Sequence, residues 1–104
     1  MLIQKSSLTV GEIVAMKLVN GDEIVCRLGE IKESSYVLER PCVVVGGAKG
    51  IGLIQAMFSA DPTKDIEVGK QHVMMHAEVI KEMQDHYMQV TTGIQVASSG
   101  SIVT

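Results

Sequence analysis

Hydrophobic and polar residues alternate along the first half of the chain with the two-residue period of half-buried β-strands. The alternation starts at Val14, is interrupted by a short polar stretch and then resumes on the same apolar face. The interruption contains Asn20 and Gly21, a pair that tolerates the positive φ angles of a tight hairpin turn. We therefore predict an antiparallel pair of strands over residues 14–19 and 23–32.

Three further apolar stretches extend this β pattern into the middle of the chain. The first covers residues 36–45 and contains Pro41, which removes a backbone donor and therefore suits an edge strand or a bulge. It runs into a glycine-rich loop over residues 46–50, which leads to another apolar segment at 51–59. A short strand is predicted at 66–68.

The hydrophobic period changes near residue 80. From Ile80 to Val90, apolar residues recur at spacings of three to four, which predicts an amphipathic helix over residues 80–92. The preceding residues 71–80 fit two patterns, a strand or the first part of one long helix. We favour a strand followed by a helix, because apolar and polar side chains alternate there.

Length and composition predict one small domain with an aliphatic core. The chain has 104 residues, of which 46% are hydrophobic, but only two tyrosines and one phenylalanine are aromatic. We expect a single domain over residues 1–104, with a β core at about 13–79, a helix at 80–92 and a frayed tail at 93–104. No uncharged apolar run reaches the roughly 18 residues of a membrane span, so no membrane partner is expected.

The two cysteines indicate the redox compartment of the protein. Cys26 and Cys42 lie far apart without metal-binding spacing, which suggests two buried thiols in a reducing compartment. We therefore expect a cytoplasmic protein.

The formal net charge of −3 argues against broad electrostatic capture of nucleic acid. A small basic rim, repeated by the symmetry of an oligomer, is compatible with this net charge.

One string imitates a cofactor site. Residues 46–52, GGAKGIG, match the glycine-rich cofactor turn of the short-chain dehydrogenases. That fold needs several β-α repeats, and its catalytic pair has the spacing Tyr-x-x-x-Lys. Neither Tyr36 nor Tyr87 has a lysine four positions later. We predict no enzyme activity and no cofactor, with a nucleotide-cofactor enzyme as the third alternative.

A pair of histidines raises the question of a metal site. On a helix, His72 and His76 would share a face and could hold one zinc ion. On a strand the two rings would be about 13 Å apart at ~3.3 Å per residue, which is too far for one ion. No Ser/His/Asp or Cys/His set stands out either, so we predict no metal site and no catalytic residues.

The hairpin and the third strand together resemble the first half of the Sm and Sm-like family. Residues 18–21, LVNG, match the family's hydrophobic-x-x-Gly opening, and the polar stretch 30–35 falls where the family has its third loop. The whole chain is most similar to the small Sm-like proteins of cyanophages and related marine phages. In these proteins the closing strand is followed by a helix that ends near a tyrosine, here Tyr87. The adjacent Lys-His of Hfq-type bacterial members becomes Lys70-Gln71-His72.

The resemblance implies a fold and an assembly. The expected fold is mainly β: a small, strongly bent five-stranded antiparallel sheet or open barrel with a C-terminal helix. Two edges of such a sheet stay unpaired, and head-to-tail pairing of one edge with the other edge of the next subunit closes a ring. The resemblance implies a homo-oligomeric ring of five to seven subunits.

The resemblance also implies binding of single-stranded RNA at the pore or rim of the ring. The candidate RNA-binding residues are Lys32, Tyr36, Lys70 and His72. Tyr36 could stack on a base, while the three basic residues could meet phosphates or base edges. Each residue also has a purely structural interpretation, such as strand packing for Tyr36. The alternative function is a structural or protein-interaction ring module with a protein partner and no nucleic-acid binding.

Overall fold

Six antiparallel strands and a C-terminal helix make up the described part of the chain. The structure, a computed structural model, describes residues 8–48 and 50–92. In chain order, its elements are β1 (Ile13–Leu18), β2 (Glu23–Ile31), β3 (Ser35–Gly47), β4 (Gly50–Gln55), β5 (Ile66–Gly69), the short 3-10 helix η1 (Lys70–His72), β6 (Val73–Glu78) and α1 (Lys81–Thr92). The prediction of a mainly β fold with a bent antiparallel sheet and a C-terminal helix is confirmed. The predicted tail at 93–104 lies outside the described residues.

The sheet follows the order β4-β3-β2-β1-β6, and β5 pairs with β3 beside this path. The long strand β3 therefore has two partners on one side, β5 along its first part and β4 along its second. The described sheet has six strands instead of the predicted five, because two short strands share this edge of β3. The residues between them, 56–65, contain a proline and two turns, which interrupt the strand.

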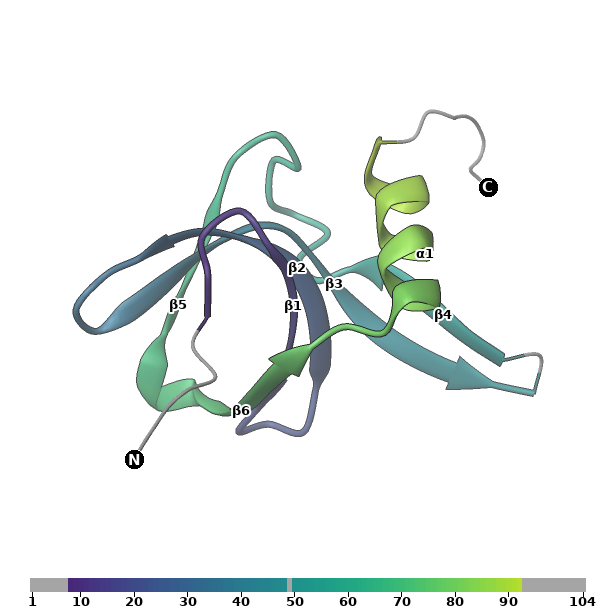
Figure 1. Cartoon of the computed structure of the whole chain (residues 1–104), viewed down its shortest axis with the longest axis horizontal. Helices are drawn as coiled ribbons and strands as arrows, with labels where there is room; N and C mark the ends of the chain where they lie inside the picture. Colours follow the sequence, from purple (N-terminus) through teal and green to yellow (C-terminus); the bar gives the residue numbers. More distant parts are fainter. Residues whose placement is uncertain (1–7, 49, 93–104) are drawn as a thin grey trace.

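The sheet curls so that its two ends approach one another through η1 (Figure 1). The chain leaves the β3 edge at Lys70, whose N–H donates to the Ser34 carbonyl at 2.9 Å. It joins the β1 edge at His72, whose carbonyl accepts from the Val19 N–H at 2.9 Å. One continuous segment thus connects the two ends, but no ladder pairs β5 with β6 and the sheet remains open.

The first hairpin forms as its sequence predicts. Gly21 has a φ angle of +98°, and Asn20 Oδ1 accepts a hydrogen bond from the Asp22 N–H at 3.0 Å. This turn places β1 and β2 in antiparallel register, with Val14 opposite Cys26. The predicted strand at 71–80 is also present as η1 followed by β6, so the single long helix is wrong.

Two hydrophobic clusters lie on opposite faces of the sheet. The inner cluster contains Val14, Met16, Ile24, Cys26, Leu28 and Leu38. The outer cluster contains Val25, Cys42, Val79 and Tyr87, and it buries one side of α1. Cys26 and Cys42 therefore belong to different clusters and remain free, buried thiols, as predicted.

A β-bulge in β3 is completed by a tyrosine from the helix. Two residues of β3, Arg40 and Pro41, face a single residue of β2, and this accounts for the proline inside the strand. The buried hydroxyl of Tyr87 accepts a hydrogen bond from the Arg27 N–H at 3.0 Å and donates to the Glu39 carbonyl at 2.8 Å. It thereby supplies partners for backbone groups at the point where the ladder is interrupted.

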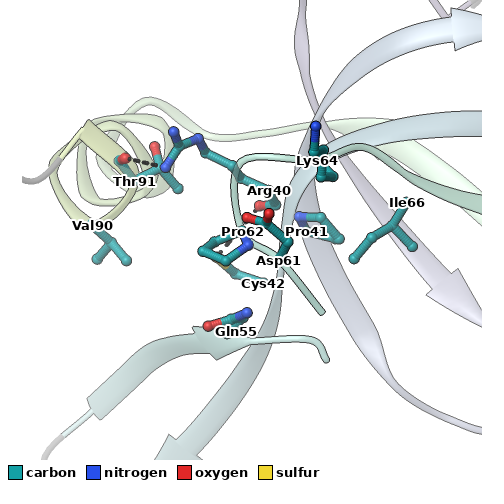
Figure 2. Close-up of a pocket in the computed structure, with 10 residues that line it drawn as sticks. All are labelled: Arg40, Pro41, Cys42, Gln55, Asp61, Pro62, Lys64, Ile66, Val90 and Thr91. Carbon is teal, nitrogen blue, oxygen red and sulfur yellow. Dashed lines mark hydrogen bonds between the residues drawn. The ribbon is translucent and has the colours of Figure 1, made fainter. Parts of the chain in front are cut away.

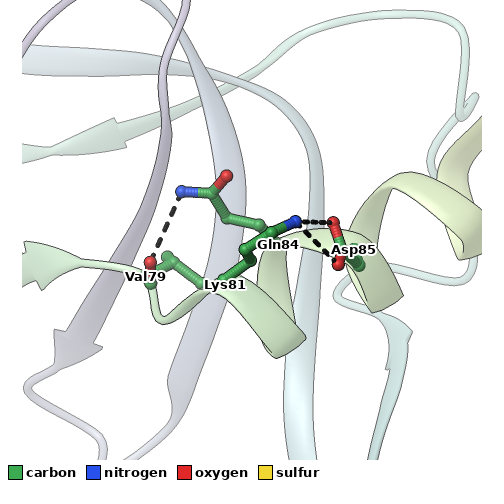
Figure 3. A network of polar contacts seen from close by, with 4 residues as sticks. All are labelled: Val79, Lys81, Gln84 and Asp85. Carbon is green, nitrogen blue, oxygen red and sulfur yellow. Dashed lines mark hydrogen bonds and ion pairs between the residues drawn. The ribbon is translucent and has the colours of Figure 1, made fainter.

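Polar side-chain contacts lie at both ends of α1. At its start, Gln84 donates to the Val79 carbonyl at 3.4 Å, and Lys81 pairs with Asp85 at 3.2 Å (Figure 3). At its end, Arg40 Nη1 donates to the Thr91 carbonyl at 2.9 Å. A cation at this end of a helix also interacts favourably with the helix dipole. No helix among the described residues has both the length and the apolar character needed to cross a membrane.

Candidate functional site

The structure brings three of the four predicted RNA-binding residues to one end of the sheet. Tyr36 lies near the start of β3, Lys32 in the tight turn before it, and Lys70 at the start of η1. The turn is held by the Lys32 N–H, which donates to the Ser35 carbonyl at 2.9 Å. The pairing of β3 with β5 then brings η1 alongside the turn.

The ammonium group of Lys70 covers the ring of Tyr36. Lys70 Nζ lies 5.3 Å from the ring centroid, within the range of a cation–π contact. The half-buried Tyr36 also packs against the inner cluster. The pair therefore combines an aromatic surface with a positive charge, the combination that favours stacked bases and phosphates.

Lys32 already has an acidic partner. Its Nζ lies 3.5 Å from Glu67 Oε2, and the same carboxylate accepts a hydrogen bond from Ser35 Oγ. The hydrogen bond from Ser35 is the main reason why the pKa of Glu67 falls below its ordinary value, and the charge of Lys32 lowers it further. A phosphate that binds Lys32 must compete with this carboxylate.

His72 lies close to the other candidates in the chain, but its side chain is exposed. It is the last residue of η1, two positions beyond Lys70, and its carbonyl holds the Val19 N–H. His76 lies on β6, so the i, i+4 geometry of a helical zinc pair is absent. Among residues 8–48 and 50–92, no three His, Cys, Asp or Glu side chains gather closely enough to hold a metal ion.

The string that imitates a cofactor turn forms a β-hairpin. Gly46 pairs with Ile51 and Gly47 pairs with Gly50, so the string connects two antiparallel strands. A dinucleotide turn places its pyrophosphate at the N-terminus of the helix that follows. In this structure β4 follows instead, and the string lacks that anion-binding helix end.

A small cavity that the sequence analysis missed lies between the end of α1, the bulge and the segment before β5 (Figure 2). Its volume is about 130 Å³, and it is lined by Arg40, Pro41, Cys42, Gln55, Asp61, Pro62, Lys64, Ile66, Val90 and Thr91. These residues come from four separate segments, so no local motif signals the cavity. Burial raises the pKa of the Cys42 thiol to about 11, which keeps it protonated and weakly nucleophilic near neutral pH.

Comparison with known proteins adds no assignment. No protein-family model matches this chain, and no curated protein matches its sequence.

Proposed function

We propose that this protein assembles into a homo-oligomeric ring and binds single-stranded RNA at the end of the sheet that carries Tyr36 and Lys70. The observation that supports this function best is the position of Lys70 over the Tyr36 ring. Lys32 lies in the adjacent turn and His72 ends η1, so all four candidates belong to two neighbouring segments. Symmetry would repeat this weak site once per subunit and raise its avidity.

The free edges of the sheet support the assembly. Within residues 8–48 and 50–92, β5 pairs only with β3 and β6 pairs only with β1, so in this part of the chain each leaves one edge of backbone groups unpaired. Pairing of the β5 edge of one copy with the β6 edge of the next is a head-to-tail contact that can close into a ring. We propose five to seven subunits, as the resemblance to Sm-like proteins implies.

RNA binding can be tested by fluorescence anisotropy of the full chain with U-rich and A-rich oligonucleotides at two salt concentrations. We expect Lys70→Gln to weaken binding and to reduce its salt dependence, because one phosphate contact is lost. Tyr36→Leu should weaken binding by roughly tenfold, since stacking of one base on an aromatic ring contributes about 1–3 kcal/mol.

The matched control is Lys81→Gln, which removes the same charge from an exposed lysine of α1. This variant should bind RNA as the wild type does. If the assembled wild-type protein binds neither oligonucleotide at the lower salt concentration, the RNA-binding function is wrong. Native mass spectrometry of the same samples gives the number of subunits independently.

The second candidate function is a protein-interaction or structural ring without nucleic-acid binding. The ion pair between Lys32 and Glu67 favours this second function. Lys32 already has a carboxylate partner, so of the two candidate lysines it is less available to a phosphate. Each added subunit also contributes a net charge of −3, which repels nucleic acid at long range. An assembled ring that fails to bind RNA would support this function.

A further inference from the structure

Hydrogen bonds fix the segment that closes one side of the cavity beside the bulge. This segment, residues 56–65, is attached to the bulge where the Ala56 N–H donates to the Pro41 carbonyl at 3.0 Å. Gln55 Nε2 donates to the carbonyls of Met57 at 2.9 Å and Ala60 at 3.3 Å. The walls of the cavity are therefore preformed, as in most small-molecule sites.

Most of the cavity wall is apolar. It is formed by Pro41, Cys42, Pro62, Ile66 and Val90. The pKa of the Cys42 thiol, raised to about 11 by burial, keeps this wall uncharged. The cavity volume of about 130 Å³ is close to the roughly 150 Å³ of an engineered apolar cavity that binds benzene. A branched aliphatic side chain therefore fits between these walls.

Three charged side chains line the open side of the cavity. Arg40, Asp61 and Lys64 are all exposed, and Asp61 lies between the other two in the view of Figure 2. Neither of the two ion pairs in the described part of the chain involves any of the three. Two cations and one anion thus surround an apolar cavity without neutralising one another in close ion pairs.

Each of the three groups keeps an atom available for a ligand. The hydrogen bond described for Arg40 uses only Nη1, which leaves Nη2 and Nε. Both hydrogen bonds from Thr63 to Asp61 end on Oδ1, which leaves Oδ2. These two bonds also lower the pKa of Asp61, so its carboxyl group is charged near neutral pH. Lys64 Nζ belongs to neither described ion pair.

Arg40 occupies its place in an unfavourable backbone conformation. Its φ angle is +48°, and it is the one non-glycine residue with positive φ among residues 8–48 and 50–92. Glycine adopts this region without steric penalty, whereas an arginine does not. Residues held in such conformations cluster at ligand-binding sites.

We propose that this cavity binds a free α-amino acid with a branched aliphatic side chain. The side chain of the ligand lies between the apolar walls, its carboxylate contacts Arg40 and Lys64, and its ammonium group contacts Asp61. A free amino acid carries both charges on adjacent atoms beside an apolar group, and this matches the arrangement of the cavity. The cavity shares no residue with the candidate RNA site, so this inference does not rest on the proposed function.

The test titrates the isotope-labelled full chain with leucine and two analogues and records chemical-shift changes. Isocaproate is leucine without its ammonium group, and isoamylamine is leucine without its carboxylate. We expect a Kd for leucine on the order of 1 mM, because so few ligand atoms contact the protein. Each analogue should bind about fivefold more weakly, since one exposed charge contact is lost. The largest shifts are expected at Cys42, Ile66 and Val90.

Two variants assign the charges of the ligand. Asp61→Asn keeps the oxygen that accepts from Thr63 and removes the negative charge, so it should weaken leucine binding but not isocaproate binding. Lys64→Gln should weaken leucine and isocaproate alike and leave isoamylamine unchanged. The matched control is Lys81→Gln, which removes the same charge from α1 and should leave all three affinities unchanged.

Val90→Phe tests the location of the site. Val90 is 44% exposed on α1, so a larger side chain there fills the cavity without entering the core and should abolish leucine binding. Circular dichroism and the melting temperature should stay close to wild type. Shifts that persist in this variant overturn the proposal, because the ligand then binds elsewhere. Equal affinities for leucine and both analogues also overturn it, as does a titration without shifts at the cavity residues.

Discussion

A single hydroxyl group connects the helix of this protein to the irregular point of its sheet. Tyr87 is 1% exposed, and its oxygen contacts backbone groups of Arg27, Glu39 and Arg40. These residues lie at the bulge, where the register between β2 and β3 shifts. The tyrosine was recognisable in the sequence as an apolar helix residue, but its hydrogen-bonding role depends on a bulge 47 or more positions away.

We predict that Tyr87→Phe lowers the free energy of unfolding by about 1–3 kcal/mol, because buried backbone groups lose their partner while the ring remains. Urea denaturation followed by circular dichroism measures this change. The control is Thr92→Val, which removes an exposed hydroxyl that bonds only to a carbonyl of its own helix. Equal losses in the two variants would contradict the role assigned to Tyr87.

At the scale of the elements, the turns show most directly how local sequence fixes structure. Gly21, in the β1–β2 turn, has a φ angle of +98°, in the left-handed region that glycine adopts without penalty. Gly46, in β3, has no positive φ angle, and open space surrounds the Cβ position of both glycines. The two positions therefore differ in conformation and not in steric room.

We predict that Gly21→Ala destabilises the protein by about 1 kcal/mol or more, since alanine is strained at positive φ. Gly46→Ala should change the free energy of unfolding by a few tenths of a kcal/mol at most, because alanine adopts extended backbone readily. Thermal unfolding of the two variants beside the wild type checks both values. A larger loss for Gly46→Ala than for Gly21→Ala would show that packing controls these sites.

Local patterns predicted the elements better than their arrangement. The Asn20-Gly21 turn, the strand at β6 and the helix at α1 each follow from neighbouring residues, so their prediction needed no tertiary information. The pairing of β3 with two strands on one side depends on contacts distant in sequence, and the strand count was therefore wrong. In the candidate site, too, some features were predicted from the sequence and others needed contacts between distant residues. Tyr36 and Lys70 were proposed from a family resemblance, whereas the ion pair between Lys32 and Glu67 required the structure.

At the scale of the whole molecule, the two faces of the sheet determine the chemistry of the cysteines. Cys26 faces the inner cluster and Cys42 faces the outer one, so the sheet itself separates the two thiols. Desolvation raises the pKa of Cys26 to about 12 and that of Cys42 to about 11, in each case from an ordinary value of 9.0. Both thiols therefore stay protonated in the folded protein at pH values at which the thiols of the unfolded chain begin to lose their protons.

We predict that stability falls as the pH rises above 9, because the unfolded chain then releases thiol protons that the folded chain retains. The contribution of the two thiols to the free energy of unfolding is fully present below pH 9 and is lost between pH 9 and about 11–12. Urea denaturation at pH 8 and above pH 9 measures it, with the Cys26→Ala/Cys42→Ala double variant as the control. If the double variant loses as much stability as the wild type, the thiols are not responsible.

The contact between Tyr87 and the bulge also constrains how the chain can fold while it is being synthesised. The strands β1 to β3 leave the ribosome long before Tyr87, yet their bulge obtains its hydroxyl partner only from α1. Because β6 must also return to β1, the sheet remains incomplete until β6 has emerged. Completion of the fold of the described residues is therefore a late step in their synthesis. A nascent chain that stalls before residue 87 exposes both an unfinished core and its free strand edges to the quality-control machinery.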